Sequence, residues 1–263
     1  MGKIYMTACM KGGCAKTVTT YNLAYSLKEL GKKVLCVDFD SQANLSICFG
    51  VENPVAVPVT IGHLMMAQID DELPGFKEYI QSRNGMDFIS SSMMLSAVDA
   101  KLRLEMGEEK MLSEILEPLR DRYDVIIIDT APTLGALNIN ALAAADEVII
   151  TVNPQLLAMM GLQDFLKTVK KIRARVNDRL SVAGILLTMY DARTNLCKVI
   201  TEPVRDTFEG QIRIFESRIP NTVKVGESVY YSEPLIEYAP ESNATKAYKN
   251  LAKELINYEG ESK

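Results

Sequence analysis

The chain has 263 residues, of which 48% are hydrophobic, and a formal net charge of −5. This composition suffices for one large α/β domain, and the acidic balance excludes a globally basic nucleic-acid binder while leaving room for a local basic patch. Five cysteines without Cys-x-x-Cys spacing, no signal-peptide pattern and no apolar run of about 18 residues predict a cytoplasmic protein with reduced thiols and no membrane partner.

Apolar strand patterns alternate with helical patterns along the chain. The strands are expected at residues 4–9, 34–38, 86–90, 125–129, 148–152, 182–188 and 212–215. The helices are expected at residues 18–30, 61–68, 73–81, 95–104, 109–122, 161–176, 195–208 and 242–255. This alternation predicts a doubly wound, mostly parallel sheet with helices on both faces. No linker or repeat interrupts it, so we expect a single domain over residues 1–263.

The turn between the first expected strand and helix reads Lys11-Gly-Gly-Cys-Ala-Lys-Thr. Gly12 and Gly13 let the backbone approach an anion closely, and the following N–H groups point out of a helix N-terminus, which favours negative charge. Lys16 supplies a charge for β/γ-phosphates and Thr17 a hydroxyl for Mg²⁺. The segment therefore predicts a phosphate-binding loop, although alanine stands at position 15 where the general pattern has glycine.

Two further strand ends carry carboxylates. Asp38 and Asp40 follow the apolar residues 34–37, and alternation places them on one face, where they could orient water or hold a Mg²⁺ shell. Asp129 follows four apolar residues, as in a Walker B strand that fixes a carboxylate beside the metal. Gly135 would let a loop N–H approach a γ-phosphate. Together the three strand ends predict a nucleotide site.

Residues 11–17 resemble the deviant Walker A box of the ParA/MinD superfamily, usually K-G-G-x-G-K-[ST]. The resemblance runs almost end to end and is closest to the ParA/Soj chromosome- and plasmid-partition ATPases. The supporting segments are residues 38–45, 128–135, 140–146, 186–196, 219–220, 223–227 and 247–255.

The resemblance implies a P-loop ATPase that uses ATP and Mg²⁺ and hydrolyses ATP slowly. Lys11 would reach the partner's phosphates across an ATP-sandwich homodimer, and Lys16 would hold the β/γ-phosphates. Asp40 would position the hydrolytic water. The metal would be held by Thr17, Asp38 and Asp129. The nucleotide-binding residues would be Lys11, Gly12, Gly13, Cys14, Ala15, Lys16, Thr17, Val18, Gly135, and, beside adenine, Met189 and Pro220.

The family's ATP-bound dimers bind double-stranded DNA without sequence preference, which implies a nucleoid-associated protein. Arg193 matches a DNA-contacting arginine of the family, and Lys224 stands where a second arginine is usual. A ParB-type centromere-binding partner would stimulate hydrolysis. The chain departs from the family at Ala15, Val18, Ser41, Asn221 and Val229. Alanine at position 15 fits the loop only if that residue needs a negative φ.

Three alternatives follow from these departures and from the superfamily. A MinD-like membrane ATPase would need an amphipathic C-terminal helix with exposed apolar residues, and the acidic tail from Lys253 argues against it. A nitrogenase-like reductase would need cluster cysteines after Asp129, where Thr130 and Ala131 stand. The third is a nucleotide-gated binding module with little hydrolysis, motivated by Ala15 and Val18.

Overall fold

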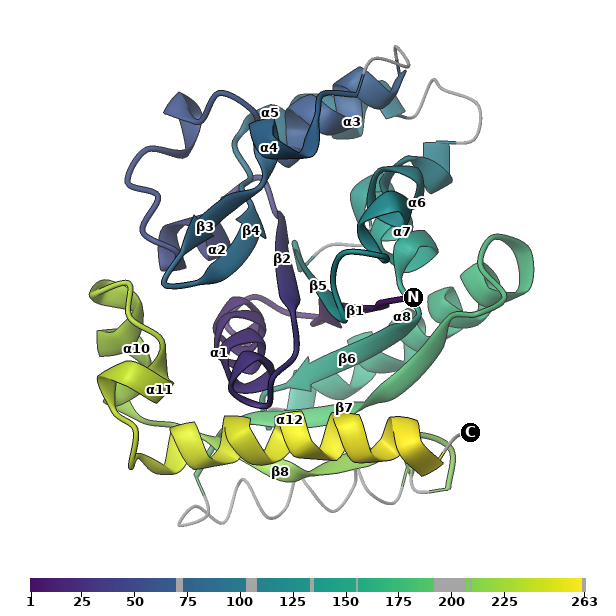
Figure 1. Ribbon diagram of the computed structural model, residues 1–263. Helices are drawn as coiled ribbons and strands as arrows, with labels where there is room; N and C mark the ends of the chain where they lie inside the picture. Colours follow the sequence, from purple (N-terminus) through teal and green to yellow (C-terminus); the bar gives the residue numbers. More distant parts are fainter. Residues whose placement is uncertain are drawn as a thin grey trace.

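The structure is a computed structural model that describes residues 1–69, 73–102, 108–132, 135–154, 156–191, 207–208 and 210–261 (Figure 1). Its strands are β1 (Lys3–Ala8), β2 (Val34–Phe39), β3 (Gln81–Arg83), β4 (Met86–Ile89), β5 (Val125–Thr130), β6 (Glu147–Val152), β7 (Ser181–Tyr190) and β8 (Ile214–Pro220). They form one sheet in the order β3-β4-β2-β5-β1-β6-β7-β8. Only the β3–β4 pair is antiparallel among the pairs that the structure describes, so the expected doubly wound, mostly parallel sheet is confirmed.

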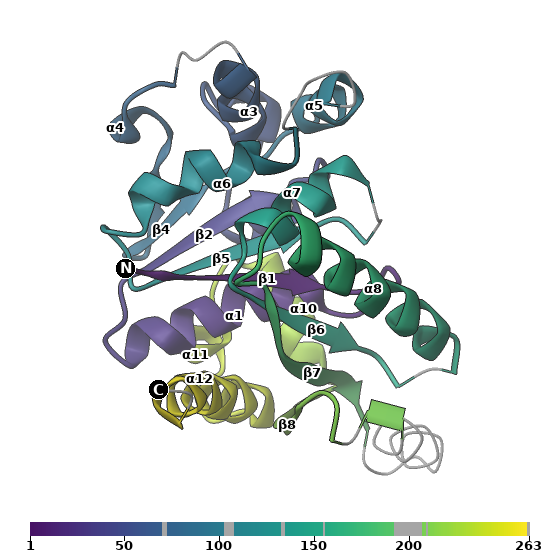
Figure 2. The ribbon, with the colours of Figure 1, turned by 90° about the vertical axis from the view of Figure 1, so that its right-hand side faces the viewer.

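Helices cover both faces of the sheet, as the view in Figure 2 shows. The α-helices are α1 (Lys16–Glu29), α2 (Asn44–Cys48), α3 (Ile61–Ile69), α4 (Phe76–Tyr79), α5 (Met94–Leu102), α6 (Met111–Leu116), α7 (Ala136–Ala144), α8 (Leu156–Arg175), α10 (Val223–Tyr230), α11 (Leu235–Tyr238) and α12 (Asn243–Glu261). Short 3₁₀ turns are η1 (Pro54–Ala56), η2 (Glu108–Lys110) and η3 (Glu117–Leu119). None of these described helices combines the length and apolar character that crossing a bilayer requires.

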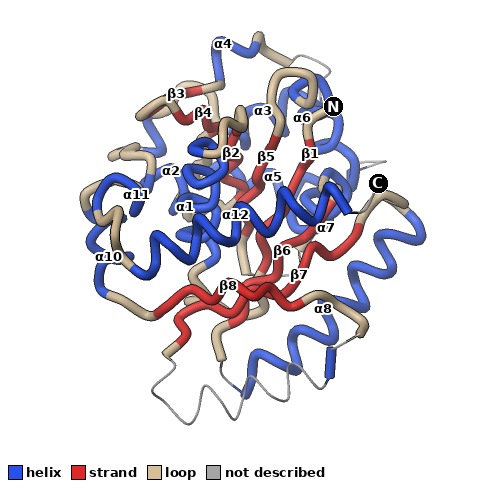
Figure 3. Tube along the Cα trace, turned by 60° about the horizontal axis from the view of Figure 1, so that its bottom comes forward, coloured by secondary structure: helices blue, strands red, loops and turns tan. Residues whose placement is uncertain are grey.

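Strand alternation divides the core into two clusters. In β5, Ile126 and Ile128 belong to the cluster beneath α3, α5, α6, α7 and α8, whereas Val125 and Ile127 belong to the cluster beneath α1, α11 and α12. Helix α12 packs on α1 and β8, so the end of the chain completes the second layer (Figure 3). A central strand buried on both faces reads as a continuous apolar run, which is why β5 was recognisable from the sequence.

Several expected elements differ from the structure. The expected helix over residues 109–122 is divided into η2, α6 and η3. Pro118 accounts for the end of α6, because it lacks the N–H that a continuous helix needs there. The expected helix over 73–81 shrinks to α4, since Gln81 begins the edge strand β3, which pairs with β4. The expected helix over 195–208 lies outside the described residues except for residues 207–208.

Candidate functional site

The carboxyl ends of β1, β2 and β5 carry a row of polar side chains. The strand register pairs Thr7 with Asp129 and Asp129 with Asp38, and all three side chains are buried. The residues two positions earlier in each strand belong to the core cluster beneath α1, so the row faces the N-terminus of α1. The sheet therefore delivers two carboxylates beneath the turn that leads into α1.

The first turns of α1 bind Asp129 directly. Lys16 Nζ lies 2.9 Å from Asp129 Oδ1, and the Thr17 hydroxyl donates to Oδ2 at 2.7 Å. The Thr20 hydroxyl also donates to Oδ1, at 3.3 Å. Burial alone would lower the pKa of Lys16, but the charge and hydrogen bond of Asp129 outweigh it and raise that pKa above its ordinary value. Lys16 is thus held as a cation in a closed environment.

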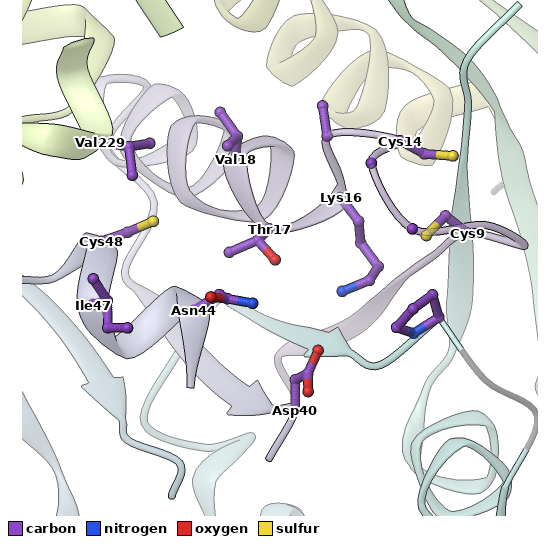
Figure 4. A pocket seen from close by; sticks show the side chains of 14 residues that line it. Cys9, Cys14, Lys16, Thr17, Val18, Asp40, Asn44, Ile47, Cys48 and Val229 are labelled. Carbon is purple, nitrogen blue, oxygen red and sulfur yellow. The ribbon is translucent and has the colours of Figure 1, made fainter. Parts of the chain in front are cut away.

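A cavity of about 370 Å³ lies over this turn (Figure 4). Its walls include the backbone of Gly12 and Gly13, where an added Cβ would meet no atom within 4 Å. Asp40 is 6% exposed and directs its carboxylate toward Lys16 and Thr17 in Figure 4, while Asp40 Oδ1 accepts a 3.0 Å hydrogen bond from the Gln42 N–H. The cavity thus combines an open glycine backbone, a buried cation and a carboxylate.

Asp38 is not among the described residues that line this cavity, and neighbouring groups donate hydrogen bonds to both of its carboxylate oxygens. Its Oδ2 accepts 2.7 Å bonds from both the Ser46 N–H and the Ser46 hydroxyl, and its Oδ1 accepts one from the Asp40 N–H at 3.3 Å. Burial, followed by repulsion from Asp129, raises the pKa of Asp38 to about 7, although the Ser46 bonds oppose the shift. Its predicted role as a metal ligand remains a prediction; its described contacts tie β2 to α2.

A second cavity, of about 310 Å³, lies on the other side of the loop. Met189 and Pro220, the residues predicted beside adenine, both line it, together with Tyr248 from α12. Gly13 and Ala15 line both cavities, so the loop separates a cationic compartment from a more apolar one. An apolar slot next to a phosphate-binding turn is the arrangement that a nucleoside triphosphate needs, with the base and the phosphates on different sides.

Ala15 corrects an expectation from the sequence. Alanine at position 15 was expected to need a negative φ, but Ala15 has φ 54° and ψ 29°, in the left-handed region, at the N-cap position of α1. A Cβ makes this conformation unfavourable by about 1–2 kcal/mol, which glycine would avoid. The turn therefore keeps the glycine-type conformation and stores strain.

The remaining predicted residues are dispersed. Lys11 is an exposed residue of the loop, and Val18 lines the first cavity. Gly135 is the N-cap of α7; among the described residues of its loop, the first cavity is lined by Pro132 instead. Lys224 lies in the first turn of α10, where its Nζ is 2.9 Å from Glu227 Oε2. Arg193 lies outside the described residues.

Sequence reasoning missed part of the cavity wall. The residues concerned are Cys9, Asn44, Ile47 and Cys48. Three of them belong to α2, a five-residue helix that is too short to show periodicity. Thr20 was also missed, because its hydroxyl reaches Asp129 only once α1 is folded against β5.

The donor atoms suit magnesium. Thr17 and Asp129 offer a hydroxyl and a carboxylate, the hard oxygen ligands that Mg²⁺ prefers when it bridges protein and phosphate. Lys16, held between Asp129 and the loop, supplies a cation for phosphate oxygens. The site therefore fits a magnesium–nucleotide complex.

Comparisons with known proteins agree with this geometry. A family model described as an AAA domain matches residues 2–182. The chain is 35% identical over 257 residues to the sporulation initiation inhibitor protein Soj of Bacillus subtilis, covering 97% of this chain and 98% of that protein. It is 35% identical to the chromosome-partitioning ATPase Soj of Treponema pallidum, over 99% and 100% of the two chains.

Solved structures resemble the fold throughout its length. The cobyrinic acid a,c-diamide synthase of Mycobacterium smegmatis, with bound ATP analogue and magnesium, has a TM-score of 0.86 at 28% identity, covering 100% of this chain and 98% of that chain. The septum site-determining protein MinD of Pyrococcus horikoshii, complexed with Mg-ADP, has a TM-score of 0.80 at 25% identity, with 99% and 98% covered. The chain is thus an ATPase that uses ATP and Mg²⁺, and it belongs to the ParA/Soj partition ATPases of the ParA/MinD superfamily.

Proposed function

We propose that this chain segregates DNA by cycling between a monomer and an ATP-bound sandwich homodimer that binds double-stranded DNA without sequence preference. A ParB-type centromere-binding protein would stimulate its slow hydrolysis and release it. The observation that carries the proposal is the convergence of Lys16 and Thr17 on Asp129 beneath an open glycine turn, with Asp40 at the same cavity. The similarity to the two Soj proteins is the reason for proposing that the ATPase acts in DNA segregation.

We propose the following residue roles, which these contacts support. Lys16 exchanges Asp129 for the β/γ-phosphates, while Thr17 and Asp129 hold the metal, which when bound neutralises phosphate charge. Asp40 orients the attacking water, because its carboxylate is at the cavity but is not bound to Lys16 or Thr17 in any described hydrogen bond. Asp38 supports the metal shell through the same strand end.

Lys11 acts in the partner's site rather than in its own. It is exposed at the outer turn of the loop, where a side chain can reach a second molecule placed against the cavity mouth. A cation supplied in this way stabilises the charge that develops on the phosphoryl group only when the dimer has formed. Hydrolysis is thereby coupled to dimerisation.

The nucleotide base occupies the second cavity between Met189 and Pro220, and the backbone of residues 12–18 surrounds the phosphates. Gly135 approaches the γ-phosphate from the start of α7 when the nucleotide is bound. We further propose that residues 1–263 act as a single domain in the cytoplasm, associated with the nucleoid.

DNA binding uses Arg193 and Lys224. Lys224 is exposed, but its ion pair with Glu227 competes with phosphate for the same ammonium group. Its contribution in the monomer is therefore reduced, and a DNA phosphate must displace Glu227 to gain the full charge. Arg193→Glu should weaken DNA binding and its dependence on salt while leaving ATP binding unchanged. Loss of both activities would assign Arg193 a structural role instead.

Sedimentation of the purified protein tests the cycle. The samples contain ADP, ATP or a slowly hydrolysed ATP analogue, each with and without non-specific duplex DNA. We expect a dimer only with ATP or its analogue, and co-sedimentation with DNA only for that dimer. A nucleotide-bound monomer that ignores DNA would refute the dimer and DNA parts of the proposal.

A further inference from the structure

Two cysteines flank the turn of the phosphate-binding loop. Cys9 follows β1 directly and Cys14 lies just before α1, and both side chains are buried in the loop while lining the first cavity (Figure 4). Both thiols donate to one acceptor, the Lys11 carbonyl oxygen, with sulfur–oxygen distances of 3.2 Å for Cys9 and 3.0 Å for Cys14. Because both sulfurs lie within hydrogen-bonding distance of one oxygen, they are neighbours on the same side of the loop backbone. The fold therefore brings two sulfurs together across the loop's own turn.

The pair is chemically asymmetric. The neighbouring Cys9 thiol lowers the pKa of the Cys14 thiol to about 6, against the effect of burial, whereas the Cys14 thiol and burial raise the pKa of Cys9. The positive charge of Lys11 also favours the Cys14 thiolate. Burial raises the pKa of Cys36, and it raises that of Cys48 to about 12. Among the described cysteines, Cys14 is thus the nucleophile and Cys9 is its adjacent thiol.

We propose that Cys9 and Cys14 form a thiol–disulfide site that a hydroperoxide oxidises, and that the disulfide closes the phosphate-binding loop to nucleotide. The Cys14 thiolate attacks a peroxide oxygen; the O–O bond breaks, the sulfur becomes a sulfenic acid and the displaced oxygen leaves as water once protonated. The Cys9 sulfur then attacks the Cys14 sulfur and expels a second water. Two thiols and one hydrogen peroxide give one disulfide and two waters.

The disulfide acts on nucleotide through the loop backbone. A covalent bond between Cys9 and Cys14 draws their sulfurs to about 2.05 Å and closes a ring that contains Gly12 and Gly13, whose N–H groups are needed for phosphate. The far end of this ring is anchored, because the Cys14 carbonyl accepts a 2.9 Å bond from the buried Thr188 hydroxyl of β7. The loop, rather than the sheet, must therefore change shape. This inference rests on the proposed role of the loop in binding phosphates.

Tryptic mapping tests the chemistry separately from the function. Trypsin cleaves after Lys3, Lys11 and Lys16, so Cys9 and Cys14 fall in different peptides, residues 4–11 and 12–16. The protein, in a Cys197→Ser background, is treated with limiting hydrogen peroxide, alkylated and digested. We expect the two peptides to appear joined, with the mass of two hydrogen atoms missing. Saturating Mg-ATP, which covers the loop, should slow the joining.

Binding of a fluorescent ADP analogue to the same samples tests the consequence. We expect the affinity to fall by at least about tenfold on oxidation and to return with a thiol reductant. The readout for each variant is its affinity after peroxide relative to its own affinity before peroxide. Peroxide should not change the affinity of Cys14→Ser, whatever its starting value, whereas it should lower the affinity of Cys48→Ser, which changes another cysteine of the cavity wall, as it does in the parent protein.

Two results would overturn the inference. One is a Cys14 sulfinic acid at limiting peroxide without joined peptides, and the other is a joined pair whose affinity for the analogue is unchanged. Failure of the reduced protein to bind the analogue at all would instead count against the nucleotide site, because the peptide assay reads the sulfur chemistry independently.

Discussion

The buried ion pair between Lys16 and Asp129 makes a prediction about stability in the absence of nucleotide. Lys16→Met removes the ammonium group and leaves a fully buried carboxylate with hydroxyl donors but no counter-charge. Breaking a buried pair in this way costs about 3–5 kcal/mol, because the remaining charge is uncompensated. At about 2.1 cal/mol/K per residue over 263 residues, this loss lowers Tm by about 5–9 °C.

A double-mutant cycle separates the pair from its individual residues. Asp129→Asn should destabilise comparably, because it leaves Lys16 charged and buried. The double variant Lys16→Met/Asp129→Asn carries neither charge. Its loss of unfolding free energy should therefore be smaller than the sum of the two single losses, by about 2–3 kcal/mol. Denaturant unfolding without nucleotide measures all four proteins.

The exposed pair of Lys167 and Asp164, with Nζ and Oδ1 2.8 Å apart, is the matched control. Both side chains are 71% exposed, so Lys167→Met should change the unfolding free energy little. Strict additivity of the two buried substitutions would refute the reasoning, because it would mean that Lys16 and Asp129 do not stabilise each other.

Four further predictions concern the loop and the neighbouring strand end. Ala15→Gly should stabilise the protein by about 0.5–1 kcal/mol, the left-handed strain of alanine less the greater unfolded-state entropy of glycine, and a loss of stability in thermal unfolding would contradict the strain. By the same reasoning, Gly13→Ala should lower the unfolding free energy more than Gly12→Ala. An added Cβ would meet no atom within 4 Å at either site, and of the two only Gly13, with φ +80°, is in the left-handed region. Equal losses in the two variants would argue against backbone strain as the cause. The pKa of Asp38 is raised from 3.8 to about 7, so the folded state binds this proton more tightly and stability falls as pH rises through that window. Asp38→Asn should flatten this part of the stability–pH profile, and an unchanged slope would assign it to other groups. Asp40→Ala should trap the ATP-bound dimer, as measured by turnover and sedimentation; unchanged turnover would remove Asp40 from the mechanism.

Much of the sheet could be predicted because its central strands are buried on both faces. The apolar run of β5 and the following Asp129 can be recognised from the sequence without knowing which strands lie beside β5, since a strand end with a carboxylate is a local pattern. The same holds for the glycine turn before α1. The edge strand β3 could not be read, because its three residues are polar or charged and gain strand structure only by pairing with β4.

The site was harder to predict than the sheet, for a physical reason. Thr20, Ile47 and Cys48 acquire their positions from helix packing, which no spacing in the sequence encodes. The backbone of Ala15 was predicted wrongly because residue type was taken to determine φ. The capping turn of α1 imposes the left-handed conformation, and the surrounding fold holds an alanine in it.

Helix α12 has a consequence for the newly made protein. The Tyr248 hydroxyl lies 3.3 Å from the Thr19 hydroxyl of α1, and Tyr248 lines the cavity assigned to the base. Ribosomes make α12 after every other element that the structure describes, so this cavity stays incomplete while the loop of residues 11–17 has long emerged. A nascent chain therefore lacks part of the wall of the base-binding cavity until α12 folds onto α1. Because nucleotide binds the complete cavity more tightly, its binding stabilises the fully folded chain relative to the partly folded nascent chain.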